Sequence, residues 1–207
     1  MTGNGSGVQA EREEAGGGEP MRVIAGSAKG HRLISLKGTD TRPTLDRVKE
    51  SLFSVIASYV PEARVLDLFS GSGSLAIEAL SRGAASALCV ERSRQAVRVI
   101  HKNLELTRLA SKAEVWPIDV RSALRRLAKS DRRFDLVFAD PPYHAGWAPQ
   151  VVADCAACGI VDTGGLLVVE HGFQEELESS VENLALIRLL TYGDTRLSIY
   201  QAGEKTV

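Results

Sequence analysis

Between residues 64 and 201 the chain alternates short apolar runs with segments in which apolar residues recur at helical spacing. The runs have the length and composition of buried strands. Such alternation is typical of a parallel sheet that helices cover on both faces. The last two runs are separated by a short turn and can pair antiparallel. The predicted strands are 64–69, 87–91, 114–118, 134–139, 166–170, 184–190 and 196–201.

The segment before this unit has a different pattern. Arg22–Gly26 and His31–Leu36 suggest a short β-hairpin, and Thr44 is a plausible N-cap for a helix that Pro61 ends. The first twenty residues hold six glycines and almost nothing to bury, which predicts a disordered extension. The chain therefore divides into an extension (1–20), an N-terminal hairpin and helix (21–60) and a main domain (61–207).

The composition is that of a soluble globular protein, with 44% apolar and 25% charged residues in 207 positions. We find no apolar run of membrane-spanning length and no secretory signal. The three cysteines, Cys89, Cys155 and Cys158, do not form a disulfide framework. We expect a cytoplasmic monomer. We also expect no bound metal, because Cys155 and Cys158 form a lone C-x-x-C with no histidine nearby.

Basic residues are concentrated in two places. The net charge is −1, but residues 21–207 carry 24 basic and 22 acidic side chains. Between residues 22 and 49 seven basic side chains stand against only Asp40 and Asp46. Such a cluster can follow the phosphates of a nucleic acid. A second cluster, at 121–133, holds six Lys and Arg, and there a solvated helix face is the favoured interpretation.

The first strand of the main domain leads into the loop Asp67-Leu-Phe-Ser-Gly-Ser-Gly73. Its glycines let the backbone approach a ligand at a helix N-terminus. The loop also satisfies the loose dinucleotide pattern, with Glu91 18 residues beyond Gly73. The carboxylate of Asp67 counts against a dinucleotide, because it would repel a pyrophosphate. It suits the ammonium and sulfonium of S-adenosylmethionine, although it can also cap the turn.

Carboxylates follow the next two strands as well. Glu91 can accept both hydroxyl hydrogens of a ribose. Asp119 can accept from an adenine amino group, cap the helix that starts at Val120, or do both. Because ligands of open parallel sheets bind at the carboxyl ends of the strands, these side chains are expected at one site.

The most specific motif is Asp140-Pro-Pro-Tyr143, directly after the fourth strand. The two prolines stiffen the loop and remove two N–H donors. Asp140 and the carbonyl of Pro141 can accept the two hydrogens of a planar amino group, which orients its lone pair toward a sulfonium methyl group. The ring of Tyr143 can stack on a base that is turned out of its helix. The motif therefore indicates methyl transfer to an exocyclic amine.

The chain resembles the class I S-adenosylmethionine-dependent methyltransferases, and within them the bacterial family that methylates N2 of a guanine in 16S ribosomal RNA. The likeness runs from about Met21 to Gln201. It rests on three blocks, which are Arg22–Gly30 with Arg42–Phe53, Asp67–Ala79, and Asp140–Tyr143. The second and third blocks are typical of amino-group methyltransferases, and the first narrows the likeness to this family.

This resemblance implies a Rossmann-like α/β fold with a seven-stranded, mostly parallel sheet, an antiparallel last strand and an N-terminal hairpin that helps to hold RNA. It implies S-adenosylmethionine as cofactor and the small ribosomal subunit, or an assembly intermediate of it, as partner. Together with the strand-end positions, it assigns the cofactor to Thr44, Asp67, Phe69, Gly71, Ser72, Gly73, Glu91, Arg92, Asp119, Val120 and Asp140; RNA to Arg22, Lys29, Arg32, Arg42, Pro142 and Tyr143; and catalysis to Asp140, Pro141 and Tyr143.

Other functions remain as alternatives. A glutamine-N5 methyltransferase acting on protein uses a similar loop, but normally with Asn where this chain has Asp140. A DNA adenine-N6 methyltransferase usually carries an inserted recognition region, for which there is little room here. A non-enzymatic RNA-binding assembly factor would not need Asp67, Glu91 and Asp140 together.

Overall fold

The computed structural model describes residues 21–36, 43–142 and 146–204. The predictions for residues 1–20, Arg42 and Tyr143 therefore lie outside the described residues. The helices are α1 (Pro43–Val55), α2 (Ser74–Ser81), α3 (Arg94–Leu106), α4 (Val120–Ala128) and α5 (Trp147–Cys158), with 3-10 turns η1 (Ala57–Tyr59) and η2 (Ala110–Lys112). The strands are β1 (Arg64–Asp67), β2 (Ser86–Val90), β3 (Ala113–Trp116), β4 (Phe134–Ala139), β5 (Val161–Gly172), β6 (Ser180–Val181), β7 (Leu184–Tyr192) and β8 (Thr195–Ala202).

The strands form one sheet in the order β3-β2-β1-β4-β5-β8-β7-β6. The five strands β1 to β5 pair in parallel, whereas β8 is antiparallel to both of its neighbours. The sheet has eight strands rather than the expected seven, because Ser180–Val181 pairs with the start of β7 and adds a short edge strand. The order changes direction between β1 and β4, and ligands of such folds bind at this point.

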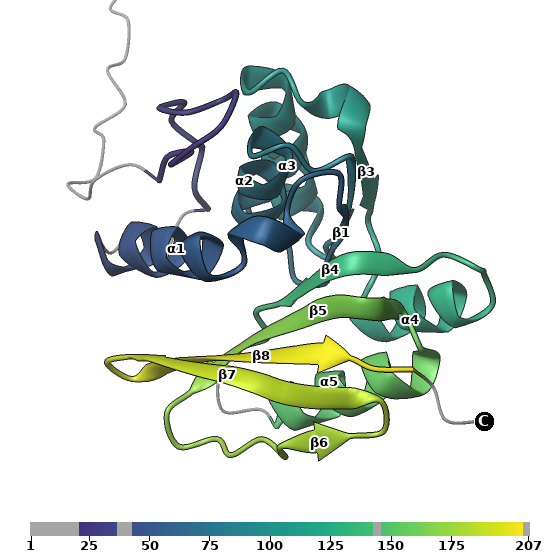
Figure 1. The fold of residues 1–207 in the computed structure, drawn as a ribbon. Helices are drawn as coiled ribbons and strands as arrows, with labels where there is room; N and C mark the ends of the chain where they lie inside the picture. The colour runs from purple at the N-terminus through teal and green to yellow at the C-terminus, as the bar shows by residue number, and fades with distance from the viewer. Residues whose placement is uncertain (1–20, 37–42, 143–145, 205–207) are drawn as a thin grey trace, which may run out of the picture.

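Helices cover both faces of the sheet (Figure 1). Helices α1, α2 and α3 enclose one apolar core, to which β1, β4 and β5 contribute Val65, Phe138 and Val168. Helices α4 and α5 enclose the other core with the alternate strand residues, such as Leu66 and Val137. Strand residues two apart point to the same face, so both layers follow from the continuous apolar runs of the sequence.

The N-terminal hairpin is present as a turn with one antiparallel bridge, between Arg22 and Arg32. It does not form two regular strands, because the backbone N–H groups of Ile24 and Ala25 donate to the Glu78 carboxylate at 2.8 and 3.0 Å. Helix α1 begins at Pro43, a residue whose fixed φ suits the first helical position. The prediction of Thr44 as the N-cap is therefore wrong, since Thr44 lies inside the helix.

Buried polar side chains fasten the segment 21–36 to α2 and α3. Glu78, fully buried in α2, also accepts from Arg82 at 2.8 Å and lies 3.5 Å from Lys49 of α1. Asn103 of α3 exchanges two hydrogen bonds with the backbone of Ile34, at 2.8 and 3.0 Å. The N-terminal segment is thus held by groups that would each lose a partner if it moved away.

Candidate active site

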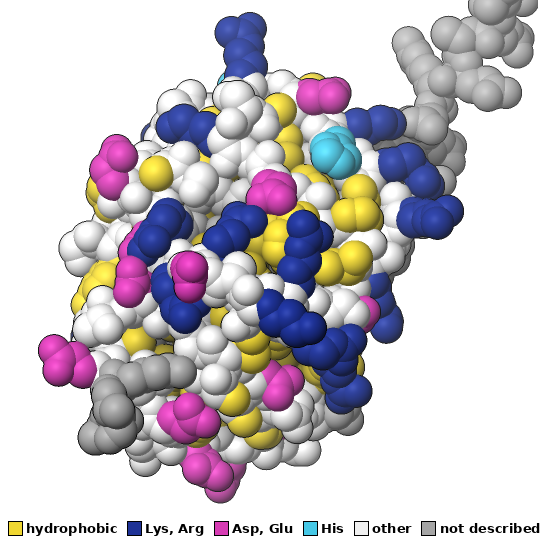
Figure 2. Space-filling model, turned by 90° about the vertical axis from the view of Figure 1, so that its right-hand side faces the viewer, with side chains coloured by type: hydrophobic (Ala, Val, Ile, Leu, Met, Phe, Trp, Pro, Cys, Tyr) yellow, Lys and Arg dark blue, Asp and Glu magenta, His cyan; other side chains and the backbone are white. Residues whose placement is uncertain are grey.

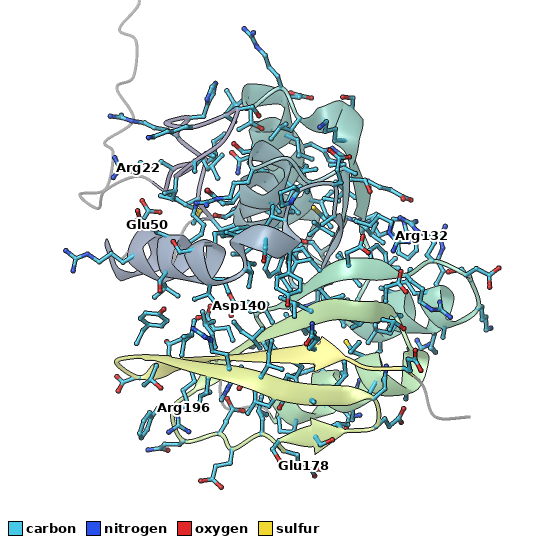
Figure 3. The ribbon with its side chains drawn as sticks, in the orientation of Figure 1. Arg22, Glu50, Arg132, Asp140, Glu178 and Arg196 are labelled. Atoms are coloured by element: carbon cyan, nitrogen blue, oxygen red, sulfur yellow. The ribbon has the colours of Figure 1, made fainter. Side chains whose placement is uncertain are left out.

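Three carboxylates lie at or near the carboxyl ends of the neighbouring strands β1, β4 and β5, on one face of the sheet. Each of them lies two positions after a strand residue that faces the core under α1, and residues two apart point to the same face of a sheet. The pairs are Val65 and Asp67, Phe138 and Asp140, and Val168 and Glu170. All three line the same cavity, of about 220 Å³. Figure 3 places Asp140 between α1 and the strands.

Helix α1 forms the wall opposite these carboxylates. Val48 and Leu52 give the cavity apolar sides, and Asp46 and Lys49 add charge. Lys49 is only 5% exposed, and its ammonium donates to the backbone oxygen of Arg22 at 2.7 Å and to Ser74 Oγ at 3.1 Å. Burial lowers the pKa of Lys49, while the nearby Glu78 opposes this effect. α1 is therefore fixed over the cavity by contacts to both the N-terminal segment and α2.

A second cavity, of about 380 Å³, adjoins the first at the ends of β2 and β3. Phe69 and Asp140 line both cavities. The other residues around the second cavity are Leu68, Val90, Glu91, Arg92, Ile118, Asp119, Val120, Pro141, Pro142 and Trp147. An elongated ligand that combines a nucleoside with an amino acid fits two adjoining cavities of this kind.

The glycine loop between the cavities is held by carboxylates. Gly71 and Gly73 have φ of 53° and 81°, a region that favours glycine. Glu91 accepts from the backbone N–H of Gly71 at 3.0 Å and of Ser93 at 2.7 Å. Asp67 accepts from the backbone N–H groups of Phe69 and Ala76. The alternative role of Asp67, as a carboxylate that caps the turn, is therefore also present.

Two carboxyl groups of the first cavity, those of Asp67 and Asp140, have pKa values above the ordinary range. Burial raises the pKa of Asp67 to about 7, against the hydrogen bonds from the loop backbone. Desolvation by the crowded walls raises the pKa of Asp140 as well, and the negative charges of Glu170 and Asp67 raise it further. Asp140 nevertheless remains exposed toward the open side of the cavity. A cationic or hydrogen-donating ligand would relieve this repulsion.

The remaining predicted cofactor residues fall into three groups. Asp119 is the N-cap of α4 and accepts from Ser122 N at 3.0 Å, so its capping role is confirmed. Because Asp119 also lines the second cavity, acceptance from an adenine amino group stays a prediction. Ser72 lines the first cavity, whereas Gly73 belongs to the turn that starts α2. Thr44 is placed only as part of helix α1.

The described residues predicted to hold RNA lie in two places, the N-terminal turn and the second cavity. Arg22, Lys29 and Arg32 are all exposed on the N-terminal turn, and Arg22 lies 3.6 Å from Asp46 at the start of α1. Figure 3 shows Arg22 above α1. Pro142 lines the second cavity and is exposed. Arg22, Lys29 and Arg32 thus form an exposed basic surface on the N-terminal turn, and Arg22 connects this surface to α1, the helix that walls the first cavity.

The second basic cluster covers α4 and the turn that follows it. Figure 2, which views the side of the molecule where β3 lies, shows Lys and Arg side chains mixed with acidic ones. Arg126 lies over the Trp116 ring at 4.0 Å, and Arg132 pairs with Glu114 at 2.9 Å. These contacts within the protein fit the interpretation as a helix face better than a phosphate-binding role.

Sequence reasoning missed several side chains at the site. The sequence predicts Glu170 only as the last residue of the strand 166–170 and assigns it no role at the site. Lys49 counted only as part of a basic cluster. Trp147 packs edge-on against Phe69 with ring centroids 6.0 Å apart and carries Arg121 over its ring at 4.8 Å. An aromatic residue at the start of the helix that follows the Asp140 loop was the feature of the sequence that could have predicted a place for Trp147 at the site.

Two observations concern the described part of the chain as a whole. No three His, Cys, Asp or Glu side chains within it are placed to hold a metal ion. None of its helices combines the length and the apolar character needed to cross a membrane.

Comparison with known proteins shows where the chain belongs. The model of the family described as conserved hypothetical protein 95 matches residues 21–201. The chain belongs to this family. The match has the same bounds as the resemblance found in the sequence. The Bacillus subtilis protein YlbH is 40% identical and aligns with 87% of this chain and 98% of its own length.

Relatives with this likeness include proteins named ribosomal RNA small subunit methyltransferase D. Those of Haemophilus influenzae and Escherichia coli are both 34% identical, over 87% and 89% of this chain and 93% and 91% of their own lengths. The resemblance to a ribosomal RNA methyltransferase family is therefore confirmed.

Solved structures agree on the fold. The Escherichia coli protein yhhF has a TM-score of 0.78 and 33% identity, covering 89% of this chain and 98% of that one. An RNA methyltransferase from Salinibacter ruber, described in complex with S-adenosyl-L-homocysteine, has a TM-score of 0.57 and 16% identity over 78% of this chain and 94% of that one. The predicted class I methyltransferase fold is confirmed.

Proposed function

We propose that this protein transfers a methyl group from S-adenosylmethionine to the exocyclic N2 amine of a guanine in 16S ribosomal RNA. The observation that carries the proposal is the position of Asp140, which lines both cavities. A group placed there can touch an acceptor amine in the first cavity, close to a cofactor whose nucleoside lies in the second cavity and whose amino-acid end lies near Asp67. The names of the relatives support the small-subunit RNA as substrate.

The residues around the two cavities fit S-adenosylmethionine. The carboxylate oxygens of Glu91 keep lone pairs that can accept from ribose hydroxyls, beside the hydrogen bonds that they already take from the loop. Asp67 gives the buried end of the first cavity an acidic group suited to a cationic amino acid. When bound, the cofactor would supply an electrophilic methyl group on a positively charged sulfur.

Asp140 and the Pro141 carbonyl would hold the acceptor. An exocyclic base nitrogen is a poor nucleophile because its lone pair is delocalised into the ring. Accepting both N–H hydrogens fixes the amine in place and turns its lone pair toward the methyl group, so the chief contribution of the protein is positioning. The raised pKa of Asp140 means that a hydrogen-bond donor in the cavity stabilises its ionised form. Tyr143 is proposed to stack on the base.

The exposed cations of the N-terminal turn would hold the surrounding RNA. Arg22, Lys29 and Arg32 are exposed on one turn, which contacts α1 through Arg22, so phosphates bound there would flank a base inserted into the first cavity. The base must leave its stack to reach Asp140, which favours an exposed loop nucleotide in an assembled or partly assembled small subunit. A cytoplasmic location is part of this proposal.

Labelled methyl transfer to three acceptors tests the function. The acceptors are small-subunit particles from a strain that lacks the activity, duplex DNA, and a glutamine-bearing protein factor. We expect N2-methylguanosine from the particles and no label in the other two. Label in N6-methyladenine or in the protein would support the alternative methyltransferases, and no transfer at all would support a non-enzymatic assembly factor.

A further inference from the structure

Glu170 lines the first cavity, where the acceptor base is proposed to bind, and the proposed function gives it no role. It follows Val169 near the end of β5, and Val169 is paired with Ala139 of the neighbouring strand β4. Asp140 follows Ala139, so the two carboxylates stand side by side at the ends of adjacent parallel strands, which are about 4.8 Å apart. Both face the cavity under α1.

The surroundings of this pair suit a flat, hydrogen-donating ligand. Apolar side chains line the cavity on either side of the two carboxylates, with Val168 and Leu197 from the sheet and Val48 and Leu52 from α1. The charge of Glu170 contributes to the raised pKa of Asp140, as expected for two acidic groups at short range. Glu170 is absent from the second cavity, where a nucleoside fits.

Guanine carries donors that match two neighbouring acceptors. Its N1–H and its N2 amino group stand next to each other on one edge of the ring, whereas the N1 atom of adenine is an acceptor that a carboxylate would repel. We infer that Glu170 accepts a hydrogen bond from guanine N1–H while Asp140 accepts from the N2 amine. This inference rests on the proposed function, and it makes Glu170 the residue that selects guanine among bases with an amino group.

The experiment compares guanine with 2,6-diaminopurine at the methylated position. Diaminopurine keeps the 2-amino group but has an acceptor at N1. Small-subunit particles are reconstituted with either base, and kcat/KM is measured for the wild type, for Glu170→Gln and for Glu176→Gln. Glu176 is exposed in the loop after β5 and does not line either cavity, so its variant controls for the change of charge.

We expect the wild type and Glu176→Gln to prefer guanine by about 10- to 100-fold. Glu170→Gln should lose most of this preference, chiefly by a gain of activity on diaminopurine, because its amide can accept from guanine N1–H through the oxygen or donate to the N1 acceptor of diaminopurine through the N–H. Its affinity for S-adenosylhomocysteine, measured by calorimetry, should match that of the wild type.

The outcomes separate this inference from the function on which it rests. A wild type that methylates guanine N2, with a Glu170→Gln variant that keeps the same base preference, would overturn the role of Glu170 alone. Loss of cofactor affinity in that variant would overturn it too, by placing Glu170 on the cofactor. A wild type that methylates the 2-amino group of neither guanine nor diaminopurine at this position would refute the proposed function itself.

Discussion

The carboxylate of Glu91, at the end of β2, accepts a hydrogen bond of 3.0 Å from the backbone N–H of Gly71, in the loop after β1. The same side chain accepts from Ser93 N at 2.7 Å, at the start of α3. Glu91 therefore fixes the conformation of the glycine loop before any ligand arrives. A residue proposed to bind the ribose also shapes the part of the site next to it.

Replacing Glu91 should weaken cofactor binding for both reasons. We expect Glu91→Ala to reduce the affinity for S-adenosylmethionine by at least about tenfold, since a hydrogen bond to a charged group contributes roughly 1.5–3 kcal/mol. Isothermal calorimetry measures the affinity, with Glu105→Ala, at an exposed position of α3, as the control. Equal affinities in the two variants would remove Glu91 from the cofactor site.

The buried carboxyl of Asp67 predicts a pH dependence of stability. Its pKa is raised to about 7 from an ordinary value of 3.8. Between these values the folded protein binds a proton that the unfolded chain does not, so this group makes folding less favourable as pH rises from about 4 to 7. Asp67→Asn should therefore raise the free energy of unfolding of the cofactor-free protein at pH 8, by at most about 4 kcal/mol.

The same substitution should weaken cofactor binding at pH 8, because the ionised carboxylate attracts the cation. Urea unfolding at pH 5 and pH 8 measures the first effect and calorimetry the second. Asp131→Asn, at an exposed position, provides the matched control. An Asp67→Asn protein that is less stable than the wild type at pH 8 would contradict the assignment of burial as the dominant cause.

Asp140→Ala should abolish most turnover and leave cofactor affinity nearly unchanged. The carboxylate is proposed to hold the acceptor amine, and removal of a comparable positioning group costs about 10²- to 10³-fold in kcat. Single-turnover kinetics on small-subunit particles measure the chemical step, and calorimetry measures the cofactor. A variant that keeps wild-type turnover would take away the role proposed for the Asp140 loop.

Two glycines of the N-terminal turn provide a matched pair for stability. Gly26 and Gly30 have φ of 83° and 84°, so alanine at either position is strained to the same degree. A Cβ on Gly26 would lie 1.8 Å from the Ser81 backbone oxygen, while a Cβ on Gly30 has nothing within 4 Å. Gly30→Ala should cost about 1–2 kcal/mol. Gly26→Ala should cost at least about 2 kcal/mol more, measured by urea unfolding.

The basic surface of the N-terminal turn predicts salt-dependent RNA binding. Lys29→Gln and Arg32→Gln should each lower the slope of log affinity against log salt by about 0.7–0.9. Cofactor affinity should not change, because neither residue lines a cavity. Arg126→Gln, in the second basic cluster, is the comparison, and a larger effect there would shift the RNA surface to α4.

The order of strands and helices could be read from the sequence because buried parallel strands are continuous apolar runs. The fourth strand was predicted with its observed bounds, Phe134–Ala139. The extra strand β6 could not be predicted, since two residues, Ser180 and Val181, carry no period.

The residues that line the two cavities could be predicted where a side chain lies at or directly after the end of a strand, as with Asp67, Glu91 and Asp140. The contacts made by Lys49 and Glu78 could not be predicted. Glu78 stands among apolar residues of α2, and its burial depends on partners more than fifty positions earlier in the chain, at Ile24 and Ala25. No local pattern specifies such pairs. The position of α1 as the wall opposite the carboxylates therefore could not be predicted from the sequence.

The attachment of the N-terminal segment limits how this protein can be recombined with others. Its turn covers α2 through Glu78 and Ser81, whose hydroxyl accepts from Ala28 N at 2.9 Å, and it contacts α3 through Asn103. A chimera that transplants residues 21–36 onto another methyltransferase would need side chains equivalent to Glu78, Ser81 and Asn103 on the new scaffold. Without them the graft would have no place to dock, and its cations would not be presented beside a substrate cavity.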